Sequence, residues 1–134
     1  MKGDDQRLME AARNVRHNAY APYSGFNVGA ALVDEVGRVH IGCNIENAAY
    51  PEGTCAEANA IGAMVAAGGR RIVAIAIAGG RDAPEPCTPC GGCRQKIAEF
   101  ADHATRVLLL TDTGTVEAHT ASDLLPQTFH LAPP

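Results

Sequence analysis

The sequence predicts an α/β fold with a mixed sheet, antiparallel at one edge, and helices on both of its faces. Three patterns support this prediction: an amphipathic helical segment near the N-terminus, a hairpin pattern after it, and a strand–helix–strand unit over residues 72–111. The last unit implies a right-handed crossover between two parallel strands. The chain has 134 residues and shows no repeat or linker, so we expect one domain over residues 1–134.

The elements follow from apolar spacing and from the residues that interrupt it. Apolar residues recur at steps of three and four from Asp5 to Tyr20, which predicts a helix that Asp4 or Asp5 can cap. The turn D-E-V-G-R separates two apolar segments and indicates a hairpin. The I-V-A-I-A-I-A run is typical of a strand buried on both faces. The expected ranges are a helix at 5–20, strands at 26–33 and 39–45, a polar loop at 44–53, a helix at 54–67, a strand at 72–78, a loop to 89, a helix at 90–101, strands at 106–111 and 116–120, and a short helix at 121–125.

Composition narrows the class of function. The net charge is −4 and no run of Lys and Arg exceeds two residues, which argues against binding to a nucleic acid polymer. No export signal begins the sequence, and no apolar stretch approaches the roughly 20 residues that span a bilayer. We therefore expect a cytoplasmic protein that does not bind membranes and acts on a small molecule. In a reducing compartment its five cysteines favour metal binding or catalysis over disulfides.

Two short motifs carry the predicted chemistry. Cys55 and Glu57 lie in C-A-E, and Cys90 and Cys93 lie in P-C-G-G-C. Each motif falls at the expected start of a helix, where backbone dipoles favour negative thiolates. Three thiolate ligands leave the fourth tetrahedral position of Zn²⁺ open for water, as in catalytic zinc sites. Glu57 is close enough to that position to move protons, and the combined pattern matches the general signature of zinc deaminases.

Other interpretations of these residues remain open. T-C-A-E at 54–57 is also a capping box, with Thr54 as N-cap and Glu57 reaching back to it. Cys87 could join the other three cysteines in a closed structural zinc site without catalysis. We expect instead that Cys87 is a loop thiol and that Cys43 is a small hydrophobic residue of a strand.

The motifs also resemble a known family, the small homotetrameric cytidine deaminases, from about Leu8 to Phe129. Four stretches carry the resemblance: F-N-V-G-A-A-L at 26–32, N-I-E-N-A-A-Y at 44–50, T-C-A-E-A-N-A-I at 54–61 and P-C-G-G-C-R-Q at 89–95. The resemblance implies a three-layer α/β/α sandwich around a five-stranded mixed sheet. It also implies zinc-dependent hydrolysis of cytidine or deoxycytidine to uridine or deoxyuridine plus ammonia, a step of pyrimidine salvage. Within the same chemistry, a modified cytosine nucleoside or blasticidin S is the alternative substrate.

The resemblance assigns roles to further residues. It implies that Asn44 and Glu46 hydrogen-bond the ribose and that Phe26 packs against the pyrimidine. It implies a homotetramer, in which Tyr50 and Phe129 help to form active sites across subunit boundaries.

One departure from the family concerns charge at the metal. Most members carry Arg directly after the catalytic Glu, and this chain has Ala58 there. Arg94 follows Cys93 and is the nearest remaining cation in the sequence. We hypothesise that Arg94 compensates the charge of the thiolates by donating to a ligand sulfur, or fixes the loop beside it.

Overall fold

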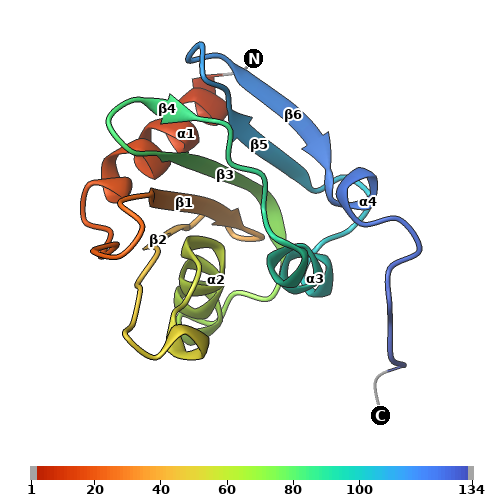
Figure 1. The fold of residues 1–134 in the computed structure, drawn as a ribbon. Helices are drawn as coiled ribbons and strands as arrows, with labels where there is room; N and C mark the ends of the chain where they lie inside the picture. The colour runs from red at the N-terminus through yellow and green to blue at the C-terminus, as the bar shows by residue number, and fades with distance from the viewer. Residues whose placement is uncertain (1–2, 133–134) are drawn as a thin grey trace.

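The computed structural model describes residues 3–132. Figure 1 shows a twisted sheet with helices on both faces. In chain order the elements are α1 (Gly3–Arg16), β1 (Asn27–Asp34), β2 (Val39–Cys43), the 3-10 helix η1 (Tyr50–Glu52), α2 (Ala56–Ala66), β3 (Ile72–Gly80), β4 (Pro84–Glu85), α3 (Gly91–Glu99), β5 (Arg106–Leu110), β6 (Val116–Thr120) and α4 (Ala121–Leu124).

The sheet has the strand order β2-β1-β3-β5-β6, and the two-residue strand β4 pairs with the end of β3. The β3–β5 pair is parallel, so the expected crossover through α3 is confirmed. Both β1–β2 and β5–β6 are antiparallel, so the expectation of one antiparallel edge was wrong. The second antiparallel edge arises because a short turn with Gly114 in a left-handed conformation (φ 83°) returns the chain directly from β5 to β6.

Side chains of the central strands point to alternate faces of the sheet, so the core has two layers. On β3 the alanines at 74, 76 and 78 pack with α1, while the isoleucines at 72, 75 and 77 pack with α2 and α3. These residues are at most 1% exposed, as expected for a strand buried on both faces. The three-layer α/β/α fold with five principal strands is thereby confirmed.

Two glycines let the helices approach the sheet closely. A Cβ on Gly29 would lie 2.0 Å from the carbonyl oxygen of Ala12 on α1. A Cβ on Gly42 would lie 2.4 Å from the backbone nitrogen of Ala60 and 2.6 Å from the carbonyl oxygen of Ala56, both on α2. Gly42 therefore sets the depth at which α2 rests on the sheet, and with it the position of the residues at the start of α2.

A buried carboxylate organises the β1–β2 turn. Asp34 accepts hydrogen bonds from the backbone N–H groups of Val36 and Arg38, from Arg38 Nε at 2.8 Å and from His40 Nε2 at 2.8 Å. Burial alone would raise the pKa of Asp34, but the hydrogen bonds, led by that from His40, outweigh it and lower the pKa. The carboxylate is thus ionised in the folded chain and ties the turn together.

The boundaries of several elements differ from the sequence-based ranges. α1 ends at Arg16 rather than Tyr20, because Tyr20 pairs in an isolated bridge with Ile45. α2 begins at Ala56 rather than Thr54, since Thr54 exchanges backbone hydrogen bonds with Ile45. Within residues 3–132, no helix is both long and apolar enough to cross a membrane.

Candidate active site

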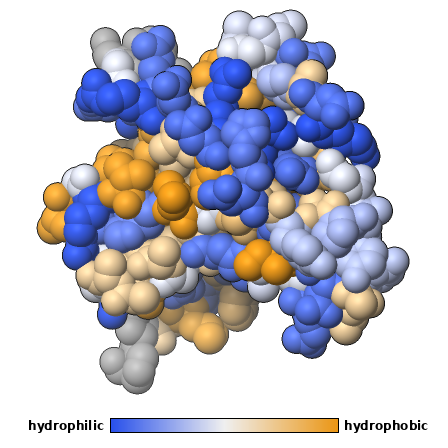
Figure 2. Space-filling view, turned by 90° about the vertical axis from the view of Figure 1, so that its left-hand side faces the viewer, coloured by the Kyte–Doolittle hydropathy of each residue, from blue (hydrophilic) through white to orange (hydrophobic). Residues whose placement is uncertain are grey.

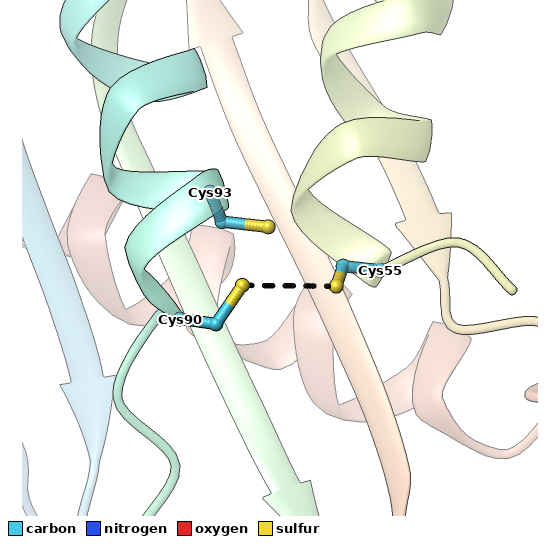
Figure 3. A group of neighbouring side chains, drawn as sticks. All are labelled: Cys55, Cys90 and Cys93. Carbon is cyan, nitrogen blue, oxygen red and sulfur yellow. Dashed lines mark hydrogen bonds between the residues drawn. The ribbon is translucent and has the colours of Figure 1, made fainter. Parts of the chain in front are cut away.

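The candidate metal centre lies where two helices begin. Cys55 is the N-cap of α2 and Cys90 is the N-cap of α3, and Cys93 lies in the first turn of α3. Figure 3 shows the three side chains pointing toward one another from these two helices. The sulfur atoms all lie within 4.8 Å of one another, and the Cys55–Cys90 Sγ distance is 4.0 Å.

This geometry fits a zinc ion. Zn–S bonds of about 2.3 Å in a tetrahedral site place two sulfurs about 3.8 Å apart. Burial raises the pKa of the thiols of Cys55 and Cys93, whereas the N–H of Cys93 donates to Cys90 and lowers the pKa of that thiol. A divalent cation would remove the cost of holding all three as thiolates. Cys55 and Cys90 line an adjacent cleft, so a fourth coordination position would face that cleft.

Glu57 is the acidic group of the site. It lies in the first turn of α2, is 4% exposed and lines the same cleft. Burial raises the pKa of its carboxyl group, and the charge of Lys96 lowers it in part. The capping-box interpretation was wrong, because α2 has no side-chain cap, and Thr54 Oγ1 instead accepts a hydrogen bond from Asn59. Glu57 thus faces the cleft as an acid of raised pKa.

The cleft has a volume of about 590 Å³, enough for a small organic ligand. It contains four of the five residues that the resemblance associates with substrate, namely Phe26, Asn44, Glu46 and Tyr50. Phe129 is not among its lining residues; it is 67% exposed on the C-terminal segment, which Figure 1 shows leaving the body of the molecule beyond α4.

The polar side chains of the cleft are held by the segment before and within β1. Asn44 accepts from the backbone N–H of Val28 at 2.8 Å and donates to the carbonyl of Phe26 at 3.0 Å. Glu46 accepts from the backbone N–H groups of Tyr23 and Ser24 at 2.9 and 3.2 Å. Both groups are therefore fixed before any ligand binds.

Tyr23, Ser24 and Cys87 are among the lining residues that the sequence motifs did not assign to the site. Tyr23 packs edge-on against Tyr50 with ring centroids 6.4 Å apart, and Ser24 contacts Glu46. Cys87 lies in the loop before α3, as expected, and also lines the cleft, where burial raises its pKa to about 12. Its sulfur is not part of the three-cysteine group. The Y-S-G-F sequence at 23–26 was the available signal, since Ser two residues before Phe26 can bond its backbone.

Arg94 follows Cys93 on α3 and hydrogen-bonds two carbonyl groups. Its Nε donates to Pro89 O at 2.8 Å and its Nη1 donates to Leu124 O at 2.8 Å. Pro89 is buried and precedes Cys90. Of the two roles hypothesised for Arg94, this geometry supports fixing the ligand loop rather than bonding a sulfur.

Comparison with known proteins identifies the family. Residues 2–110 match the family model described as the cytidine and deoxycytidylate deaminase zinc-binding region. This chain belongs to that deaminase family. Residues 2–110 contain all three cysteines of the metal centre, which agrees with zinc as the cofactor of this chain.

Individual members of the deaminase family are similar over nearly the whole chain. A cytidine deaminase of Sporosarcina psychrophila is 43% identical over 94% of this chain and 91% of its own length. One of Halalkalibacterium halodurans is 44% identical over 94% of each chain. The crystal structure of a cytidine deaminase from Burkholderia pseudomallei superposes with a TM-score of 0.85 at 44% identity, covering 96% of this chain and 100% of that chain.

Proposed function

We propose that this chain is a zinc-dependent cytidine deaminase that hydrolyses cytidine or deoxycytidine to uridine or deoxyuridine and ammonia. The observation that carries the proposal is the group of three convergent cysteine sulfurs beside a buried carboxylate in a cleft of about 590 Å³. Family membership and the names of relatives 43–44% identical to this chain support the same activity. With this substrate the reaction would be a step of pyrimidine salvage.

Cys55, Cys90 and Cys93 would hold the zinc ion. The ion would lower the pKa of a bound water and so supply the nucleophile for C4 of the pyrimidine. Glu57 would take one proton from the attacking water and deliver it to the ring nitrogen, and would then take the second from the hydroxyl added at C4 and deliver it to the leaving amine. The pKa of Glu57, which burial raises, suits this role, because a carboxyl group whose pKa is shifted toward the working pH is a better acid and base in turn.

The remaining cleft residues would bind the nucleoside. Phe26 would pack against the pyrimidine, and Arg81 supports its ring with the guanidinium carbon 5.2 Å from the ring centroid. Asn44 and Glu46 would hydrogen-bond the sugar, with Tyr50 at the exposed mouth of the cleft. Hydrogen bonds already hold Asn44 and Glu46 in the unliganded chain, which lowers the entropy lost on binding.

We also propose a homotetramer in which Tyr50 and Phe129 complete sites across subunits. Both side chains are exposed in the single chain, at 80% and 67%. The edge strand β2 adds Val39 and Ile41, each at least half exposed, and Figure 2 shows apolar side chains gathered on part of the face that lies to the left in Figure 1. Light scattering of the active protein tests this: full activity from a monomer would overturn it.

A substrate panel tests the proposed activity directly. Cytidine, deoxycytidine, cytosine and blasticidin S are each incubated with the zinc-loaded protein while ultraviolet absorbance and ammonia are followed. We expect turnover of cytidine and deoxycytidine and its loss after zinc is removed by a chelator. Turnover of blasticidin S alone would favour the alternative substrate. Zinc binding without turnover of any member would favour a structural zinc site.

A further inference from the structure

Ser24 lies in the segment between α1 and β1, which borders the cleft. This segment is fastened to the loop after β2 by two backbone hydrogen bonds, from Tyr20 N to Asn44 O at 3.0 Å and from Glu46 N to Tyr20 O at 2.7 Å. Ser24 therefore enters the cleft beside Glu46, although 22 positions separate the two residues in the sequence.

The hydroxyl group of Ser24 is used both as a donor and as an acceptor. It donates to Oε2 of Glu46, and it accepts from the backbone N–H of Phe26 at 3.0 Å. The backbone N–H of Ser24 also donates to Oε1 of Glu46. The same residue thus contacts both carboxylate oxygens of Glu46 and anchors the backbone of Phe26.

The hydrogen bonds of Glu46 leave little of its carboxylate unused. A carboxylate has about four acceptor sites. Three are taken, by the N–H groups of Tyr23 and Ser24 and by the hydroxyl of Ser24. These three hydrogen bonds fix the orientation of the carboxylate. They therefore determine the direction in which its remaining acceptor site points toward a ligand. The Ser24 hydroxyl is the one side-chain donor among the three.

We propose that Ser24 is a positioning residue for the nucleoside, which orients the carboxylate of Glu46 toward a ring hydroxyl group of the sugar. This inference rests on the proposed function of the cleft. Removing the Ser24 hydroxyl should mainly weaken the binding of ligands whose sugar offers a ring hydroxyl to Glu46, because Phe26, which also bonds Ser24, stays anchored through its carbonyl to Asn44. The removal leaves the chemistry at the pyrimidine, and the zinc site, unchanged.

The test combines a variant with a modified substrate. KM and kcat are measured for wild-type protein and Ser24→Ala with cytidine and with 2′,3′-dideoxycytidine, which lacks both ring hydroxyls. We expect KM for cytidine to rise about three- to tenfold at nearly constant kcat, because an interaction equally strong in ground and transition states is lost. For dideoxycytidine we expect KM to change less than twofold. An equal rise for both substrates, or none for either, would overturn the proposal.

Three controls separate positioning from structural damage. Ser122→Ala removes the other serine of the chain, which is exposed on α4, and should leave both substrates unaffected. Ser24→Thr keeps the hydroxyl and should restore the wild-type KM. In a Glu46→Ala background, Ser24→Ala should raise KM no further, since coupled residues are not additive. An undiminished effect in that background would contradict action through Glu46.

A readout without turnover distinguishes failure of this inference from failure of the proposed function. The Ser24 hydroxyl is the leading cause that holds the pKa of Glu46 below its usual value. In Ser24→Ala, carbon NMR of the unliganded protein should show the Glu46 carboxyl titrating at higher pH. An unchanged titration would overturn the inference, whereas a wild-type protein inactive on cytidine with a shifted titration would overturn the proposed function alone.

Discussion

Replacing Arg94 with Gln tests how the chain fixes its metal-binding loop. The guanidinium joins Pro89, directly before the ligand Cys90, to Leu124 at the end of α4. Each hydrogen bond from a charged donor contributes about 1.5–3 kcal/mol. Because Arg94 is half-buried, the lower end applies, and losing both should cost about 3 kcal/mol of unfolding free energy. For a domain of this size that lowers Tm by roughly 6–12 °C.

The assay measures Tm together with the rate at which a colorimetric chelator removes zinc. We expect Arg94→Gln to lose zinc faster, because the loop that carries Cys90 is no longer fixed. Arg94→Lys separates the two hypothesised roles. It keeps the charge, but the donors of its compact ammonium group share one nitrogen and cannot reach both carbonyls as the planar guanidinium does, so we expect it to resemble Arg94→Gln. Arg13→Gln, an exposed arginine on α1, is the matched control. Full rescue by Lys, or unchanged zinc release in Arg94→Gln, would refute the loop-fixing role.

Three further outcomes follow from the structure. Cys87→Ser should retain one zinc per chain by metal analysis while Cys90→Ser loses it; equal loss from both would indicate a four-cysteine site. Gly42→Ala should lower the unfolding free energy in urea by about 1–3 kcal/mol and weaken zinc retention, because its Cβ would strike the backbone of α2. Gly62 lies on the open face of α2, and Gly62→Ala should instead raise the unfolding free energy by about 0.5–1 kcal/mol. A loss of stability in both variants would contradict this steric account. Asp34→Asn should be less stable than wild type at pH 7, and the difference should shrink as pH falls below about 4, because a carboxyl of lowered folded-state pKa loses its stabilising effect below its unfolded pKa. A pH-independent difference would show that ionisation of Asp34 is not the cause.

Local patterns in the sequence predicted most of the fold. The I-A-I-A alternation of β3 encodes both faces of a central strand, and the range of β6 was predicted to the residue. Errors arose where distant contacts decide the outcome. β4 exists only because Pro84 and Glu85 meet the end of β3, and Thr54 leaves the helix because its backbone pairs with Ile45. Contacts of this kind produce no periodic pattern in the sequence.

The candidate site likewise contains residues that local motifs predict and residues whose roles depend on distant contacts. The C-x-x-C spacing brings Cys90 and Cys93 to one metal ion and the combined deaminase signature adds Cys55, so their convergence could be predicted from the motifs. The role of Ser24 could not, because it depends on a carboxylate brought beside it by the pairing of two loops. The orientation of the Arg94 side chain could not be predicted either. Its two acceptors, Pro89 before α3 and Leu124 after it, come together only in the folded chain.

The most direct test of the account is the kcat of Glu57→Gln for cytidine at full zinc occupancy. Gln keeps the shape of the buried side chain but cannot transfer protons, so the variant should fold, bind one zinc per chain and lose activity by about 10²–10⁴-fold. A zinc-loaded Glu57→Gln protein with turnover close to that of the wild type would contradict the assignment of Glu57 as the acid and base of the reaction.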